Sequence, residues 1–430
     1  MIIHGPNGVG KTKLLELVSA VAWPVDFSVI VRTPFEMLRL EFGDGSVFTV
    51  DKMESADLGE VEIFPPSGTE YLQVAQGLFF VLEEESGHSA VSWSPEELSR
   101  YVNKDRDGSA TARLFDLGSA MARYSEDRAS QYTSVPSWVD YLSDSGSGVL
   151  GDRIPEVMRD FLSDMVAHSI DTHRLLGLSS TTQRQGRLSF NQIPQETKVE
   201  QFAQDLARRL ASELAENSRT SQELDRTYPQ RLLETANVDV SESEIRERYD
   251  AQNDLRRRLG DISLVDDDER SSVIEIPERM EQWQRAVLWT YLRDTEDKLA
   301  TFREVLDRVS LLRNIVNSRF LFNRLEIDRE RGFRLVDGET KQELDLSSLS
   351  SGEQHELVLV YDLLFNVPPG ALVLIDEPEI SLHVSWQKSF ISDLRRIASL
   401  VKFRTIVATH SPQIAGKWVD RMVVLGPAAE

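Results

Sequence analysis

The chain has no cysteine, no apolar run long enough to cross a bilayer, and fewer basic than acidic side chains, 48 against 71 among 430 residues. Without cysteine, disulfides and cysteine metal sites are excluded. The N-terminus also lacks the basic-then-apolar pattern of a secretion signal, so we expect a cytoplasmic protein without a membrane span. The formal charge of −23 repels phosphate backbones over most of the surface, so contact with nucleic acid would need a local basic patch.

A glycine-rich motif lies close to the N-terminus. Residues 5–12 read Gly-Pro-Asn-Gly-Val-Gly-Lys-Thr, the full pattern of a phosphate-binding loop. Its glycines let successive N–H groups point at a polyphosphate, Lys11 adds positive charge for the β- and γ-phosphates, and the Thr12 hydroxyl can complete a Mg²⁺ shell. Residues 14–18 continue at helical spacing, and a helix N-terminus favours the same phosphates. This context predicts a nucleotide site rather than a glycine-rich turn with a surface lysine.

The segments around this loop predict strands and a second structural unit. Only four residues precede the loop, so either the first strand is a stub or the native chain starts upstream of Met1. Residues 35–50 alternate apolar and polar side chains around Gly-Asp-Gly, which predicts a β-hairpin. A short strand is expected near residues 170–176, and 430 residues favour two structural units.

Residues 196–318 have helical periodicity. Phe202, Leu206, Leu210 and Leu214 recur every four residues, and a second apolar stripe runs from Leu299 to Ile315. Because charged residues fill the other faces, we expect an antiparallel helical arm inserted into the nucleotide-binding core.

Two charged clusters in this region can be interpreted either as solvent-exposed surface or as functional sites. The arginines at 208–209 and 256–258 are typical of solvated helix faces, and DNA contact is the alternative. The acidic run at 266–269 is typical of a polar loop, because no apolar strand precedes it to hold carboxylates for the metal site of a nuclease.

A capping motif precedes an apolar helix in the C-terminal part. Residues 320–335 alternate and end near Asp337-Gly338, another hairpin pattern. Residues 349–354 then read Leu-Ser-Ser-Gly-Glu-Gln before the helix at 357–365, and Ser350 and Glu353 stand at the spacing of a capping box. Such a helix start also exposes N–H groups that can receive a γ-phosphate.

Polar residues follow two strands that are apolar enough to be buried on both faces. The run at 371–375 ends in Asp376-Glu377, where Asp376 would bind Mg²⁺ and Glu377 would orient and deprotonate the attacking water. The run at 405–409 ends in His410, which would contact the γ-phosphate in the same crevice. Residues 421–425 would supply one more strand.

These motifs, in this order, resemble those of the ABC-type ATPases. The stretches 349–354, 374–383 and 408–414 are most similar to the OLD-like group, which is related to the SMC and break-repair ATPases and includes ATPase subunits of Septu-, retron- and PARIS-type phage-defence systems. The resemblance implies that Glu377 is the catalytic base and that Ser350 to Glu353 reach the ATP of a second protomer. His383 stands where relatives often carry an aspartate, and His173 is the candidate for a place where relatives often carry glutamine.

The sequence thus predicts an α/β fold, an ABC-type P-loop ATPase with a mixed sheet core and a long helical insertion. We expect an N-terminal lobe at 1–195, the insertion at 196–318 and a C-terminal lobe at 319–430. The predicted cofactors are ATP and Mg²⁺. The predicted nucleotide-binding residues are Gly5, Asn7, Gly8, Gly10, Lys11, Thr12, Ser350, Ser351, Gly352 and Glu353, with Thr12 and Asp376 as metal ligands and Glu377 and His410 as catalytic residues.

The resemblance further implies a switch that forms a homodimer or higher oligomer around ATP. No nuclease, protease or deaminase motif accompanies the ATPase motifs, so a separate effector, a nuclease or toxin in phage defence, is expected as a partner. A DNA-repair ATPase that clamps DNA directly is the alternative function. The ATP-binding subunit of a transporter fits the long insertion poorly, and we expect no membrane partner.

Overall fold

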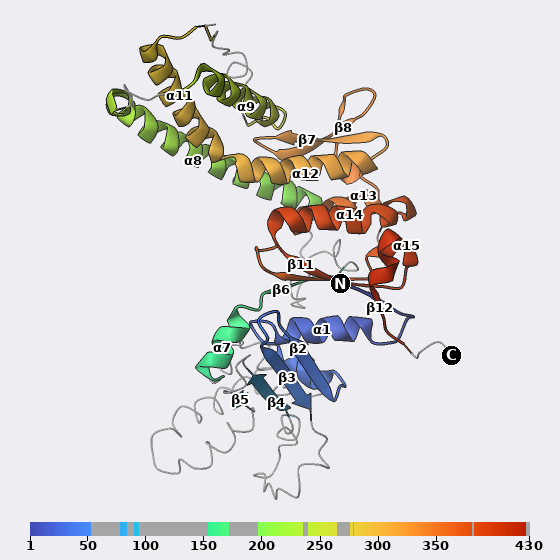
Figure 1. Ribbon diagram of the computed structural model, residues 1–430. Helices are drawn as coiled ribbons and strands as arrows, with labels where there is room; N and C mark the ends of the chain where they lie inside the picture. The colour runs from blue at the N-terminus through green and yellow to red at the C-terminus, as the bar shows by residue number, and fades with distance from the viewer. Residues whose placement is uncertain are drawn as a thin grey trace, which may run out of the picture. The chain divides into compact units, whose positions relative to one another are not determined.

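The computed structural model describes residues 1–52, 78–83, 90–93, 154–171, 197–234, 240–264, 276–277, 279–380 and 382–426 (Figure 1). The chain divides into two compact units. Unit 1 comprises Met1–His4, Ile170–Gly370 and Glu377–Val423, and unit 2 comprises Gly5–Ser169, Ala371–Asp376 and Val424–Glu430. The predicted regions 1–195, 196–318 and 319–430 are continuous along the chain, whereas each of the two units combines separate segments. The three-region division therefore stays a prediction.

The principal sheet has the strand order β12-β1-β11-β10-β6. Its strands are β1 (Ile2–His4), β6 (Ala167–Asp171), β10 (Leu372–Asp376), β11 (Arg404–Thr409) and β12 (Met422–Val424). β1 pairs with β11 in parallel, with Ile3 opposite Ala408. Val373, Leu374 and Ile375 are all buried, as a strand covered on both faces requires. The predicted α/β fold is therefore confirmed, with a parallel sheet core where a mixed one was expected, and β6 begins three residues before the predicted segment.

Unit 2 contains a four-stranded antiparallel sheet in the order β2-β3-β4-β5. The predicted hairpin is confirmed as β2 (Met37–Glu41) and β3 (Val47–Lys52), whose turn is closed by a hydrogen bond from the N–H of Phe42 to the oxygen of Ser46, 2.9 Å. β4 (Leu78–Glu83) and β5 (Ala90–Trp93) complete the sheet. Its aromatic side chains pack with α1 (Lys11–Val21), α2 (Phe27–Arg32) and α7 (Glu156–Ser163) in one hydrophobic core.

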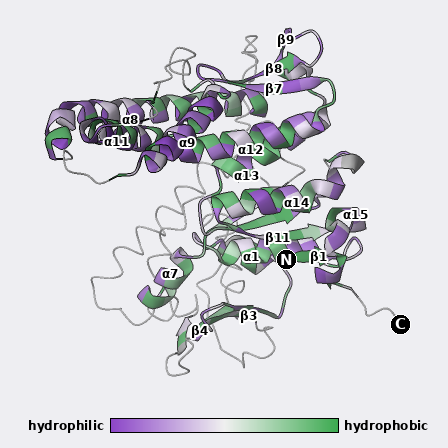
Figure 2. Ribbon diagram, turned by 45° about the horizontal axis from the view of Figure 1, so that its top comes forward, coloured by the Kyte–Doolittle hydropathy of each residue, from purple (hydrophilic) through white to green (hydrophobic). Residues whose placement is uncertain are grey.

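Unit 1 contains the helices predicted from the apolar periodicity (Figure 1). They are α8 (Lys198–Glu234), α9 (Glu242–Gly260), α11 (Gln282–Ala300) and α12 (Arg303–Arg319). Phe202, Leu206 and Leu210 on α8 are buried, and Leu214 is partly buried. Much of α9 is hydrophilic (Figure 2), and its few buried side chains pack against α11.

A small sheet follows α12 and packs against α8. It consists of β7 (Asn323–Asp328), β8 (Gly332–Asp337) and β9 (Glu343–Leu344). Gly332 has a φ of +80°, and a Cβ at this position would lie 1.9 Å from the backbone oxygen of Ala203 on α8. Only glycine therefore permits this approach of sheet and helix.

Unit 1 ends in α13 (Ser351–Phe365), α14 (Val384–Val401) and α15 (Pro412–Ala415), with 3₁₀ turns η2 (Leu346–Ser348), η3 (Pro378–Ile380) and η4 (Gly416–Arg421). Tyr361 fastens α13 to α8: its ring stacks on Phe202 with centroids 4.4 Å apart, and its hydroxyl donates to Asp205, 2.7 Å. None of the helices within the described ranges is long and apolar enough to span a membrane.

Candidate functional site: a phosphate loop and the carboxylates after β10

The phosphate loop joins the end of β1 to α1. Gly8 and Gly10 have φ values of +87° and +92°, a region that side chains with a Cβ adopt only at a cost. Gly10 is the residue before the helix, and its oxygen accepts from the N–H of Leu14, 2.9 Å. These two glycines turn the loop into the N-terminus of α1, where free N–H groups and the helix dipole favour an anion.

Lys11 folds back over the loop that precedes it. Its Nζ donates to the backbone oxygens of Gly5, 2.9 Å, and Pro6, 3.0 Å, and the residue is only 4% exposed. These bonds account for two of the three donors of an ammonium group and hold the charge inside the curl of the loop. Gly5 is needed for packing, because a Cβ there would lie 2.4 Å from the backbone oxygen of Leu425.

The first residue pair of the predicted metal site is joined directly. The Thr12 hydroxyl on α1 donates to Oδ2 of Asp376, which ends β10, at 2.7 Å. A hydroxyl and a carboxylate are oxygen ligands of the kind that Mg²⁺ takes, and Mg²⁺ commonly uses one carboxylate together with substrate phosphates and waters. These two residues therefore fit a Mg²⁺ ion bound beside a nucleotide.

Glu377 follows Asp376 in the chain and has an unusual backbone. Its φ is +44°, and its N–H donates to the oxygen of Ala408 on β11, 2.9 Å. Left-handed backbone at a residue with a long side chain costs on the order of 1–3 kcal/mol, and such strain gathers at functional sites. Oε1 of Glu377 lies 3.8 Å from Nδ1 of His410, so the predicted base and the predicted γ-phosphate contact lie together in unit 1.

Glu379 was not singled out by the sequence motifs, yet it makes the densest set of polar contacts here. Its Oε1 accepts from the Thr409 hydroxyl, 2.6 Å, and from the N–H groups of His410 and Ser411, 2.7 and 3.1 Å. In the sequence it is one more acidic residue of a loop, and nothing local indicates that it is buried. Only its place within the 3₁₀ turn η3, which packs against β11, brings it to the end of that strand.

The predicted capping box at the start of α13 is confirmed. The Ser350 oxygen accepts from the N–H of Glu353, 3.4 Å, while Oε2 of Glu353 accepts from the N–H of Ser350, 2.9 Å. Ser351 is exposed and Gly352 partly exposed, and a Cβ on Gly352 would meet only the Trp386 ring at 3.8 Å. The helix start is therefore open enough to receive an anion.

The predicted residues are divided between the two units. The loop residues Gly5 to Thr12 and Asp376 belong to unit 2, whereas Ser350 to Glu353, Glu377 and His410 belong to unit 1. The peptide bond between Asp376 and Glu377 connects the groups. His173 and the acidic run 266–269 lie outside the described residues, and within the described ranges no cluster of three or more His, Cys, Asp or Glu side chains could hold a metal ion.

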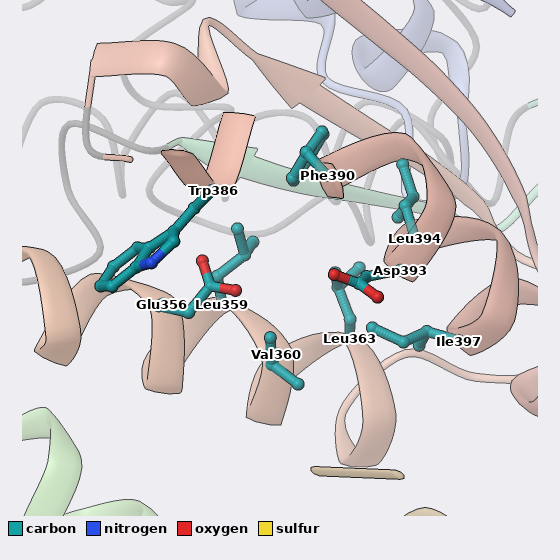
Figure 3. Close-up of a pocket in the computed structure, with 9 residues that line it drawn as sticks. All are labelled: Glu356, Leu359, Val360, Leu363, Trp386, Phe390, Asp393, Leu394 and Ile397. Carbon is teal, nitrogen blue, oxygen red and sulfur yellow. The ribbon is translucent and has the colours of Figure 1, made fainter. Parts of the chain in front are cut away.

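Three largely buried charged side chains, Glu356 on α13, Arg319 on α12 and Asp393 on α14, form a cluster. Glu356 points from α13 into a cavity of about 10 Å³ lined mostly by apolar side chains (Figure 3). Oε1 of Glu356 lies 4.0 Å from Nε of Arg319, whose guanidinium also pairs with Asp393. Burial, and secondarily the charge of Asp393, raises the pKa of Glu356 to about 7 against the opposing effect of Arg319.

Residues 160–415, more than half of the chain, match the protein family described as "AAA domain, putative AbiEii toxin, Type IV TA system". The chain belongs to this family. In this AAA-domain protein the matched range begins within α7 and ends with α15, so it includes α13, the carboxylates after β10 and His410.

Individual proteins resemble this AAA-domain protein over shorter or more distant matches. The Escherichia coli protein "Retron Ec83 probable ATPase" is 34% identical over 104 residues, which are 22% of this chain and 19% of that protein. The chain thus spans about a fifth of the length of this curated relative. One solved structure is the Smc head domain with an extended coiled coil, bound to the C-terminal domain of ScpA, from Pyrococcus furiosus. The match covers 96% of this chain and 84% of that chain, with 13% sequence identity and a TM-score of 0.31.

Proposed function

We propose that the chain binds and hydrolyses ATP, and that it acts as a switch which dimerises around ATP. The observation that carries the proposal is the 2.7 Å bond between Thr12 and Asp376. It joins the phosphate loop to a carboxylate 364 positions later in the chain, and the next residue is the strained Glu377. Nucleotide-binding loops and strand-end carboxylates meet in this way in P-loop enzymes.

The chemistry follows from the groups that the chain supplies. Lys11 and the N–H groups at the start of α1 hold the β- and γ-phosphates, and Thr12 and Asp376 would hold a Mg²⁺ ion that would neutralise phosphate charge. The Glu377 carboxylate accepts a proton from a water molecule as its oxygen attacks the γ-phosphorus. The bond to the β–γ bridging oxygen breaks, and the products are ADP and phosphate. His410 donates a hydrogen bond to the γ-phosphate.

A pair of variants tests this assignment. Lys11→Ala should abolish ATP binding because the triphosphate loses its cation, whereas Lys13→Ala is the matched control, since Lys13 is exposed and pairs with Glu16 at 2.6 Å. Glu377→Gln should keep ATP binding and stop turnover, which accumulates an ATP-bound dimer. Titration with a fluorescent ATP analogue, phosphate release and light-scattering mass measure the three properties. A Glu377→Gln protein that turns over at the wild-type rate would show that the base is another residue.

We further propose that the switch controls a separate effector, a nuclease or toxin, in antiviral defence. The names of the matching family and of the Escherichia coli relative support this role, since they refer to a toxin of a type IV TA system and to a retron. The helices between residues 198 and 319 are the proposed docking region for that effector.

The arginines that suggested direct clamping of DNA give that alternative function little support. Arg208 and Arg209 pair with Asp205 at 3.3 and 2.7 Å. Arg257 pairs with Asp254 at 2.8 Å and Arg258 with Asp307 at 2.9 Å. Arginines that are neutralised by neighbouring carboxylates attract a phosphate backbone weakly, because each would have to exchange one anion for another.

A further inference from the structure

The loop that joins α12 to β7 presents two large apolar side chains to solvent. Leu321 is 81% exposed and Phe322 is 73% exposed, whereas Phe320 before them is buried. Within the described ranges, these two and Leu233 are the most exposed of the large hydrophobic side chains. A single exposed apolar residue needs no explanation, but two neighbours enlarge one patch, and such patches mark contact surfaces.

The backbone of this α12–β7 loop is held by hydrogen bonds on both sides. The N–H of Gly338, after β8, donates to the oxygen of Phe322, 2.6 Å, and a Cβ on Gly338 would lie 2.7 Å from that oxygen. Asn317 near the end of α12 exchanges two bonds with the backbone of Leu325: its Nδ2 donates to the oxygen, 3.0 Å, and its Oδ1 accepts from the N–H, 2.7 Å. A loop that is already fixed pays little ordering entropy when a partner covers it.

The loop lies at the same end of unit 1 as the start of α13. Arg308 on α12 donates to the backbone oxygen of Leu364, 2.8 Å, and further along α12 the Nε of Arg319 lies 4.0 Å from Oε1 of Glu356. The sequence therefore rises along α12 while it falls along α13, so the two neighbouring helices are antiparallel (Figure 1). The residues that follow Arg319 thus reach the level of the first turn of α13, next to Ser350–Glu353.

We propose that Leu321 and Phe322 form an apolar contact with a second copy of this chain in the ATP-bound dimer. The proposal rests on the proposed dimerisation around ATP, in which the start of α13 reaches the γ-phosphate of the other copy. Each copy has a formal charge of −23, so two copies repel each other, and apolar burial beside the nucleotide offsets that repulsion. In a two-fold dimer both copies contribute the same two side chains.

The absence of cysteine allows a direct test of coverage, because Leu321→Cys introduces a single thiol while Phe322 remains. In a Glu377→Gln background, ATP and Mg²⁺ should slow modification of this thiol by a maleimide at least about tenfold, because only open chains react. The slowing should increase with protein concentration. Leu233→Cys is the matched control and should react at an unchanged rate: Leu233 is 80% exposed but lies about 45 Å along α8 from Phe202, which stacks on α13.

A second variant tests whether the contact stabilises the dimer. In the Glu377→Gln background, Phe322→Ser should raise the dissociation constant of the ATP-bound dimer about a hundredfold, because both copies lose the burial of a large apolar side chain. ATP binding by the monomer should not change. Leu233→Ser, which also removes an exposed apolar side chain, should leave both properties as they are. Light-scattering mass over a dilution series measures the dimer, and titration with a fluorescent ATP analogue measures binding.

The outcomes separate this contact from the proposed function. A Glu377→Gln protein that binds no ATP, or that stays monomeric with ATP, overturns the proposed switch and the contact with it. If the dimer forms but the Leu321→Cys thiol reacts as fast as before, or Phe322→Ser dimerises as tightly as Leu233→Ser, the contact alone is overturned. Protection that is independent of protein concentration also overturns it, since the chain would then cover its own loop.

Discussion

Glu356 shows what one buried carboxyl does to the protein that contains it. It sits one turn after the capping box, 5% exposed, beside Arg319 and Asp393. Two carboxylates share one guanidinium there, and Arg319 lies closer to Asp393 than to Glu356, whose oxygen is 4.0 Å from it. Its neutral form is therefore favoured by burial, and its pKa of about 7 places the charge change within the physiological range.

Glu356→Gln should change how stability depends on pH. The pKa rises from an ordinary 4.5 to about 7 on folding, so the folded protein binds the extra proton, and stability falls as pH rises from 4.5 through 7. The full loss of stability at pH 8 is at most about 3.5 kcal/mol, since one pKa unit corresponds to about 1.4 kcal/mol. We expect the glutamine variant to gain stability over the wild type between pH 5 and pH 8, measured as the difference in urea midpoints. Parallel pH curves for the two proteins would contradict this.

At the scale of single elements, the N-terminus of α13 is both capped by the chain itself and open to an anion. Ser350 and Glu353 satisfy the first turn of the helix from within the chain. Gly352 leaves the end of the helix open, because it has no side chain and the nearest heavy atom to an added Cβ is in the Trp386 ring, 3.8 Å away. A capped but uncovered helix start can bind an anion without losing its own stability.

Gly352→Asp should block ATP-dependent closure of the dimer while leaving the fold intact. A carboxylate is favourable at a helix N-terminus, but it would face the γ-phosphate, and like charges brought together in a closed interface cost on the order of several kcal/mol. Gly352→Ala is the control, since alanine fits the space and favours helix. Light-scattering mass in the presence of ATP, in a Glu377→Gln background, measures the closure.

Mixing the two defective chains tests whether the sites are shared. A Gly352→Asp chain and a Lys11→Ala chain should form a heterodimer with one intact composite site, and ATP turnover should partly return. Absence of any rescue would argue that each chain holds its ATP alone.

At the scale of the whole molecule, the formal charge of −23 opposes contact with polyanions. Of the predicted arginine clusters on α8 and α9, Arg208, Arg209, Arg257 and Arg258 are paired with carboxylates, and Arg256 donates to Asn253 and Tyr291. This charge distribution supports the proposal that the chain acts on another protein rather than on nucleic acid.

The purified chain should accordingly cleave no DNA or RNA, with or without ATP and divalent metal. A two-metal nuclease needs carboxylates that converge on ions about 4 Å apart. The assay incubates the homogeneous protein with labelled single- and double-stranded substrates. Metal-dependent cleavage that is lost in Asp266→Ala or Asp268→Ala would make the chain its own effector and overturn the proposed need for a partner.

The sequence by itself determined the features whose physical cause is local. The positive φ of Gly8 and Gly10, the reciprocal bonds of Ser350 and Glu353, and the buried stripe of α8 each depend on residues within one turn or one loop. The α/β fold was predictable as well, because apolar runs such as 371–375 indicate strands that are covered on both faces.

Only the tertiary structure decided which polar groups meet. Glu379 reads as a loop carboxylate, yet folding places its oxygen against Thr409, 30 positions away, and Glu356 reads as one more charge on a helix, yet it is buried beside Arg319. Arg258 likewise gives no sign in the sequence that it pairs with Asp307, 49 positions away. Burial and pairing depend on contacts between residues distant in the chain, and no periodicity or spacing around a residue contains that information.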